Sequence, residues 1–213
     1  MSQIFSRRFD FLFRLAVVAA FVFVAGGIVA WRVISAPAIA APIEQPIPFS
    51  HRHHVGEAGI DCRYCHGSVE AQAYAGMPST STCLNCHSRL FADAGLLQPL
   101  QASWRSQTPV EWNPLERLPD FVYFNHSIHV AKGIGCYSCH GRVDDMALMS
   151  KAHDMTMAWC LDCHRHPERR LRPRSEIFAT RPLAVSAAEA RDLARDYHLH
   201  GTAALTACST CHR

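Results

Sequence analysis

All ten cysteines of the chain fall within five copies of one short pattern, Cys-X-X-Cys-His. In this pattern the two thiols add to the vinyl groups of a haem, and the histidine binds the haem iron. The pattern therefore predicts five covalently bound haems of type c. The predicted attachment residues are Cys62, Cys65, Cys83, Cys86, Cys136, Cys139, Cys160, Cys163, Cys208 and Cys211, and the predicted iron ligands are His66, His87, His140, His164 and His212.

Two other uses of paired cysteines are weaker explanations. Zinc-binding pairs would leave the histidine after every pair unexplained. Redox-active pairs would have to occur five times in 213 residues. Because five porphyrins would form most of the interior, we expect a mainly α fold of short helices with much irregular structure.

The N-terminal segment has the composition of a membrane anchor. Residues 15–31 carry no charge, and a helix over 15–34 would span the bilayer. Arg7, Arg8 and Arg14 precede the run, so the positive-inside rule places residues 1–14 in the cytoplasm. The rest of the chain would then lie on the periplasmic side of the inner or plasma membrane. The alternative is a signal peptide cleaved near Ala38-Ile39-Ala40, but the apolar run is long for a signal core and ends well before that site.

Two segments of the chain repeat one another. Residues 49–69 and 124–143 share a pattern of Phe, His-X-X-His, Cys-X-X-Cys-His, Gly and Val, and each copy is followed by a second haem motif. We therefore predict a linker (35–48), dihaem module 1 (49–98), a connector (99–123), dihaem module 2 (124–182) and a C-terminal helix with the fifth haem (183–213). Residues 97–118 show no helical or strand period, which indicates a surface connector. Ser186 and Glu189 form a capping box, and Gly201 is a natural helix end, so a helix is expected over 186–201.

Six-coordinate haems need a second axial ligand, and the two His-X-X-His pairs are the best candidates. Histidines three residues apart on a helix share a face but diverge enough to reach two irons, so one of each pair could reach another module. Surface roles are expected instead for His53, His153 and His166. The four predicted distal ligands are His51, His54, His126 and His129.

The fifth distal ligand stays open at this point. Met157 lies three residues before Cys160, close enough to fold over a haem, and is the first choice. His198 and His200, just before the last motif, are the alternatives, followed by an open site. A thioether ligand would raise the potential of its haem relative to a second imidazole.

The formal charge of +3 does not indicate a nucleic-acid partner, because the propionates of five haems would offset it. Of the 21 basic residues, 19 are Arg and two are Lys. Arginine suits bidentate pairing with carboxylates such as propionates, although a general bias toward Arg explains the count equally well.

Several segments resemble one known family. Residues 118–130, Leu-Pro-Asp-Phe-Val-Tyr-Phe-Asn-His-Ser-Ile-His-Val, together with Met-Ala-Trp-Cys-Leu-Asp-Cys-His at 157–164 and the terminal Cys-Ser-Thr-Cys-His-Arg, are similar to the pentahaem cytochrome c subunit of bacterial alternative complex III. The resemblance covers nearly the whole chain, and the family's similar segment also carries a Met before Trp-Cys. It implies an electron-carrying subunit, not an enzyme by itself. Its implied partners are an iron–sulfur subunit, integral-membrane quinol-binding subunits, membrane lipid, and a monohaem cytochrome c or similar periplasmic acceptor.

Two other functions compete with this electron relay. A stand-alone membrane-anchored quinol dehydrogenase would also have one N-terminal helix, but here a Pro-rich linker separates the helix from the first haem motif and a fifth haem is added. A reductase of nitrogen or sulfur oxyanions needs a haem with an open iron site, whereas this chain has enough candidate ligands to close all five. The order of the haems, their potentials and the terminal acceptor do not follow from the sequence.

Overall fold

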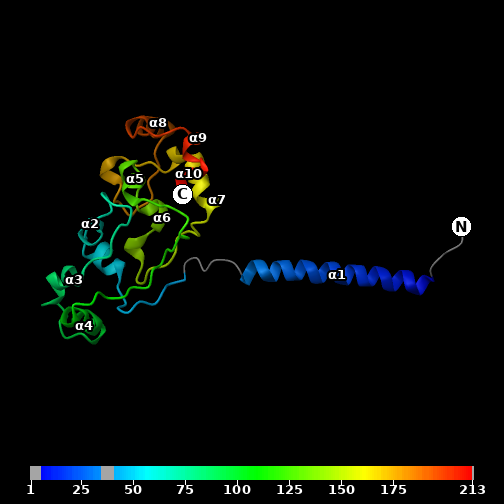
Figure 1. Cartoon of the computed structure of the whole chain (residues 1–213), viewed down its shortest axis with the longest axis horizontal. Helices are drawn as coiled ribbons and strands as arrows, with labels where there is room; N and C mark the ends of the chain where they lie inside the picture. The colour runs from blue at the N-terminus through cyan, green and yellow to red at the C-terminus, as the bar shows by residue number, and fades with distance from the viewer. Residues whose placement is uncertain (1–5, 35–40, 213) are drawn as a thin grey trace. The chain divides into compact units, whose positions relative to one another are not determined.

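The computed structural model describes residues 6–34 and 41–212, in two compact units that comprise residues 1–38 and 39–213. Figure 1 shows the whole chain. The first unit contains one long helix, and the second, here called the C-terminal unit, contains all five Cys-X-X-Cys-His motifs.

Helix α1 (Arg7–Ile34) contains the predicted membrane span but starts earlier. Its most apolar window has a mean hydropathy of 2.4, and none of its residues is buried by other parts of the protein. Because α1 begins at Arg7, it includes Asp10, which forms an i,i+4 ion pair with Arg14 (3.1 Å). At about 1.5 Å per residue, the 28 residues extend over roughly 42 Å, more than a bilayer's hydrocarbon core, so the charged first turns lie outside it if α1 spans the membrane. The possible cleavage site at 38–40 lies outside the described residues.

The C-terminal unit is built from short helices and irregular segments, as expected from the sequence. Within residues 41–212 the only β-type pairings are isolated bridges, Pro42 with Ser150, Val122 with His212 and Ile134 with Leu171. The helices are α2 (Cys62–Cys65), α3 (Thr80–His87), α4 (Gln98–Ser106), α5 (His126–Ala131), α6 (Tyr137–His140), α7 (Met157–Arg165), α8 (Ala187–Asp196), α9 (Thr202–Leu205) and α10 (Cys208–Cys211). A π-helical turn, η1 (Arg52–Glu57), and four 3₁₀ turns, η2 (Gly95–Leu97), η3 (Val143–Asp145), η4 (Pro167–Arg169) and η5 (Arg174–Glu176), complete the set.

Side-chain caps fix where the motif helices begin. The Asp61 carboxylate accepts a hydrogen bond from the Arg63 amide at the start of α2 (2.8 Å), and the Ser79 hydroxyl accepts one from the Thr82 amide in α3 (3.4 Å). Thr156 caps α7 in the same way. Such caps typically stabilise a helix by about 1 kcal/mol. Because these helices are only one or two turns long, the cap also sets the direction in which the cysteines and the histidine project.

Apolar packing in the C-terminal unit is sparse. One cluster joins Ile47, Leu97 and Leu100, and a second joins Val69, Val130 and Ile177. The second cluster connects Val69 of predicted module 1 with Val130 and Ile177 of predicted module 2. Two small clusters are little for a unit of this size, in line with the expectation that porphyrins supply much of the interior.

The prediction that residues 97–118 lack helical structure is wrong. Residues 98–106 form α4, which begins with Pro99 in its first turn and ends at Gln107, whose φ of 55° is left-handed. Leu100 is 2% exposed and packs on Leu97 and Ile47. Polar residues separate the few apolar residues of this segment, so the sequence shows no helical repeat of apolar positions.

The predicted C-terminal helix is present but ends earlier than expected. The Ser186 hydroxyl accepts a hydrogen bond from the Glu189 amide (3.2 Å), as the capping box requires. The helix α8 nevertheless stops at Asp196, because Tyr197 is buried and its hydroxyl donates to the carbonyl of Arg172 (2.8 Å). His198 follows with a φ of 47°, and Gly201 precedes α9 instead of ending α8.

Part of the predicted linker is anchored to the C-terminal unit. Residues 35–40 lie outside the described residues, but Gln45 exchanges two hydrogen bonds of 2.8 Å with the backbone of Asn113. Ile47 is buried against Leu100. Gln45 and Ile47 therefore hold this part of the predicted linker against the C-terminal unit.

Gly133 gives a test of how α8 is held in place. Its φ of +81° is in the left-handed region, and a methyl group at its Cα would collide with the Tyr197 ring. We predict that Gly133→Ala lowers the stability of the C-terminal unit by about 1–3 kcal/mol, measured by thermal unfolding. Gly95→Ala is the control, because a methyl group there would meet nothing within 4 Å. Equal melting temperatures for the two variants would contradict this account of the packing.

Candidate haem-attachment and axial-ligand sites

The histidines that end the Cys-X-X-Cys-His motifs are oriented by backbone carbonyls. The Nδ1 atoms of His66, His87, His164 and His212 lie 2.7, 3.0, 2.8 and 3.1 Å from the carbonyl oxygens of Gly76, Leu90, Leu205 and Phe121. A ring that donates from Nδ1 keeps the lone pair of Nε2 free for a metal. The remaining motif histidine is His140 of the third motif. Burial lowers its pKa to about 4, so it is neutral at physiological pH.

The His-X-X-His histidines are oriented in the same way. Nδ1 of His54 lies 2.8 Å from the Ser50 carbonyl, and Nδ1 of His129 lies 2.7 Å from the Asn125 carbonyl. His126 uses the carbonyl of Ala73 (2.8 Å). His51 differs, because its buried Nδ1 has no hydrogen-bond partner and burial lowers its pKa to about 4.

A phenylalanine before each pair explains another part of the repeat. The ring of Phe49 stacks on His54 with centroids 4.3 Å apart, and Phe124 stacks on His129 at 4.5 Å. Each Phe also meets the first histidine of its pair edge-on, at 4.8 and 4.7 Å. The two copies therefore place their histidines with the same local geometry.

The histidines come together as opposed pairs. Ring centroids are 6.1 Å apart for His54 and His87, 6.4 Å for His126 and His140, and 6.1 Å for His129 and His164. Metal–imidazole bonds of about 2.0–2.1 Å, with each ring centre about 1.1 Å beyond its nitrogen, place two ligating rings roughly 6.3 Å apart. The donor set of these pairs therefore fits a six-coordinate haem iron. Among the neighbouring histidines, His66 has the largest electrostatic effect on the lowered pKa of His51, which makes these two residues the candidates for a fourth pair.

The donor arrangement does not suit zinc. In residues 6–34 and 41–212, no group of three or more His, Cys, Asp or Glu side chains surrounds a common point. The donors face one another two at a time instead of forming tetrahedral sets.

Three of these pairs join residues of the same module. His54 faces the second motif of module 1, and His126 and His129 face the first and second motifs of module 2. The ring geometry therefore favours pairing within one module, whereas the sequence suggested that one histidine of each pair could reach into another module.

Electrostatic contacts between thiols give the spatial order of the motifs. The neighbouring Cys136 thiol lowers the pKa of Cys62 to about 7. Burial and then the neighbouring thiols of Cys163 and Cys160 raise the pKa of Cys139 to about 12. Cys83 similarly raises the pKa of Cys65, and Cys211 that of Cys160, in each case after the larger effect of burial. From these neighbours we infer the order second, first, third, fourth, fifth for the motifs, and helices α3 and α10 lie toward opposite ends of the C-terminal unit (Figure 1).

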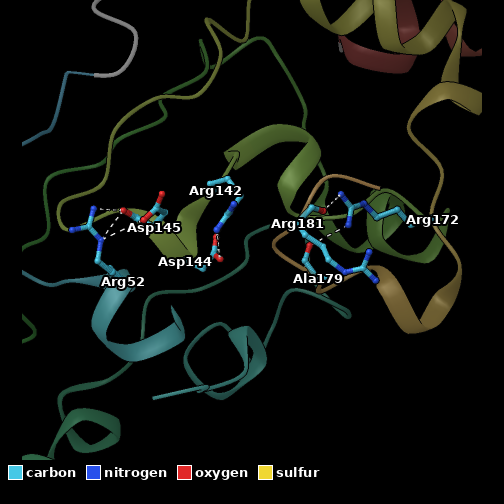
Figure 2. Close-up of polar contacts among 7 residues, drawn as sticks. All are labelled: Arg52, Arg142, Asp144, Asp145, Arg172, Ala179 and Arg181. Atoms are coloured by element: carbon cyan, nitrogen blue, oxygen red, sulfur yellow. Dashed lines mark hydrogen bonds and ion pairs between the residues drawn. The ribbon is translucent and has the colours of Figure 1, made fainter. Parts of the chain in front are cut away.

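Arg52 is a site residue that the sequence analysis missed. Figure 2 shows its guanidinium on Asp145 of η3, where Nε and Nη2 donate to the Asp145 carbonyl at 3.0 and 2.6 Å. Its amide also donates to the Met146 carbonyl (3.0 Å). Because Arg52 lies between His51 and His54, this contact fixes the ligand turn of module 1 against module 2. The second copy of the repeat has Ser127 at this place, and that difference was the available clue.

The remaining candidates lie nearer the surface. His53 pairs with Glu57 (2.9 Å), His166 with Glu168 (3.8 Å), and His153 stacks on Trp159 (5.1 Å). Met157 is 66% exposed at the first position of α7, and His198 and His200 are also exposed. Among the described residues, the ring contact of His212 is with Phe121 (5.8 Å).

Comparison with known proteins finds one relative but no matching family model. The chain is 32% identical over 171 residues to a protein of Nitratidesulfovibrio vulgaris (strain Hildenborough) described as "Menaquinone reductase, multiheme cytochrome c subunit". The alignment covers 80% of this chain and 77% of the relative. Together with the apolar helix α1, it supports a single-pass membrane protein. The chain therefore belongs to the family of multihaem cytochrome c subunits that transfer electrons in quinone-linked membrane oxidoreductases.

Proposed function

We propose that the chain is the pentahaem electron relay of an alternative complex III-like quinol:acceptor oxidoreductase. The observation that carries the proposal is the set of opposed histidine pairs, 6.1–6.4 Å apart, on motifs that follow one another through the C-terminal unit. When bound, the five haems supply one-electron oxidation and reduction. The protein attaches them, supplies their axial ligands and sets their spacing.

The order of the motifs supports a relay with two ends. In the proposed order, the second and fifth motifs stand at the two ends, and the first, third and fourth stand between them. Electrons would enter at one end and leave at the other. The Cys62–Cys136 contact is the step between the two modules.

The membrane anchor and the charge pattern support the topology. Three arginines, Arg7, Arg8 and Arg14, stand at the start of α1, whereas Arg32 alone is near its end. The positive-inside rule then leaves the N-terminus in the cytoplasm and the C-terminal unit in the periplasm. There the unit would meet an iron–sulfur subunit and quinone-binding membrane subunits on one side, and a monohaem cytochrome c or similar acceptor on the other.

A second candidate is the same relay run in the opposite direction. The relative's name, a menaquinone reductase subunit, favours electron flow toward quinone. A stand-alone quinol dehydrogenase is less well supported, because the only acidic residue in α1 is Asp10, which Arg14 already pairs. A quinol oxidised there would lack a free proton acceptor.

For the fifth haem we propose that Met157 is the distal ligand. Met157 and Cys160 are one helical turn apart on α7 and so lie on the same face. Cys160 is electrostatically coupled to Cys211 of the fifth motif. The face that carries Met157 therefore lies toward the fifth haem site.

The functional proposal predicts that quinol oxidation requires partners. The membrane complex purified through this chain should reduce an added cytochrome c with quinol, whereas the purified chain alone should not oxidise quinol above the uncatalysed rate. The readout is cytochrome c absorbance, with reduced cytochrome and menaquinone supplied in a second assay to measure the reverse reaction. Steady quinol oxidation by the chain alone would show that it is a stand-alone dehydrogenase, and faster reverse turnover would favour the quinone-reducing direction.

The paired histidines predict the spin state of single haems. We expect His54→Gly to convert one of five haems to a high-spin form in resonance Raman and electron paramagnetic resonance spectra, because the second motif loses its distal imidazole. Added imidazole should restore the low-spin spectrum. His53→Gly is the matched control, since His53 pairs with Glu57 at the surface. A high-spin signal in the control, or none in His54→Gly, contradicts the assignment.

The Met157 ligand predicts a band that no imidazole ligand gives. Oxidised wild-type protein should show a near-infrared sulfur-to-iron charge-transfer band, and one haem should titrate at a higher potential than the others. Met157→Leu should abolish the band and lower that potential. If the wild-type band is absent or survives the substitution, Met157 is not the ligand, and His198 and His200 are the next residues to test.

A further inference from the structure

Among the described residues of the C-terminal unit, Arg172 carries the most deeply buried charge. The residue is 3% exposed, and its guanidinium lies inside the loop formed by residues 174–181 (Figure 2). Nη1 donates to the carbonyls of Glu176 (3.3 Å) and Ala179 (3.2 Å), and Nη2 donates to the carbonyl of Arg181 (2.8 Å). The hydrogen bonds are therefore satisfied by neutral acceptors.

The positive charge of Arg172 is not neutralised by a direct ion pair. In the part of the chain that the structure describes, no carboxylate lies within 4.0 Å of its guanidinium. The nearest acidic residue, Glu176, instead forms an ion pair with Arg181 (2.7 Å). Burial lowers the pKa of Arg172, but a guanidinium stays protonated at physiological pH.

This charge lies directly behind the third haem motif. The guanidinium carbon is 5.3 Å from the centre of the Tyr137 ring, and Tyr137 stands between Cys136 and Cys139. A methyl group on Gly135 would approach Cδ of Arg172 to 2.6 Å, so only glycine permits this closeness. The amide of Cys136 donates to the Ile177 carbonyl (3.2 Å), which ties the loop around Arg172 to the motif itself.

We propose that Arg172 is a positioning residue whose buried charge raises the reduction potential of the third haem, an inference that rests on the proposed function. Reduction adds an electron, so a nearby positive charge stabilises the reduced state, and the effect is larger in a buried environment than in water. The third motif is the middle one in the order second, first, third, fourth, fifth. Arg172 thereby sets the energy level at which electrons cross between the two modules.

The test is a spectroelectrochemical titration of the full-length protein with all haems bound, resolved into its components. Arg172→Gln should lower the midpoint potential of one component and leave the potentials of the other four unchanged. Glu176→Gln should raise the same component, because it removes the nearest negative charge while Arg172 keeps its hydrogen bond to the backbone carbonyl of residue 176. The matched control is Arg181→Gln, the same charge change on an exposed side chain of the same loop, with a clearly smaller expected decrease.

The outcomes separate charge from structure. A role confined to holding the loop would lower the melting temperature of Arg172→Gln but would give no upward shift in Glu176→Gln. Unchanged potentials in Arg172→Gln and Glu176→Gln, equal shifts of all five components, or an Arg181→Gln decrease as large as that of Arg172→Gln would each overturn the inference. If Arg172→Gln fails to bind its haems, the shift in potential caused by Glu176→Gln tests the inference instead. An increase supports the inference, and a decrease or no change overturns it. Fewer than five haems in the wild-type protein, measured by intact mass, would instead refute the proposed function.

Discussion

The opposed imidazole pair is the interaction on which the rest of the C-terminal unit depends. Its two rings must be held about 6.3 Å apart, with Nε2 facing inward, for one iron to bond both. Backbone carbonyls on Nδ1, as at His54 and His129, leave Nε2 free, and a stacked phenylalanine holds each of these rings in place. Helix caps such as Ser79 and Thr156 position the opposite histidine. The Arg52 contact with Asp145 then joins one such assembly to the next.

The small apolar core follows from the same requirement. Within the described residues, buried apolar side chains form two small clusters, and we expect the proposed haems to supply the rest of the interior. Because covalent thioether bonds would hold the proposed haems in place, we expect folding of the C-terminal unit to be coupled to haem attachment. The proposed electron path would then follow the positions of the cysteines, and Cys62 and Cys136 would stand where it passes from one module to the other. The charge of Arg172 lies beside that crossing.

Local patterns in the sequence predicted much of this arrangement, and long-range contacts account for what it missed. The five motifs, the two His-X-X-His pairs and the cap at Ser186 each need only a few neighbouring residues. The helix α4 was missed because its apolar positions are few and a proline precedes them. The early end of α8 depends on Tyr197 reaching Arg172, 25 residues earlier in the chain. The spatial order of the motifs depends on contacts between distant cysteines, so no local pattern contains it.

The most direct test of the central claim is to locate the irons. Diffraction data collected at the iron absorption edge from crystals of the full-length protein give each iron's position without reference to the fold. The account predicts five irons, four of them between His51 and His66, His54 and His87, His126 and His140, and His129 and His164, with neighbours in the order second, first, third, fourth, fifth. Fewer than five irons, or a third-motif iron that does not lie next to the first-motif iron, would contradict it.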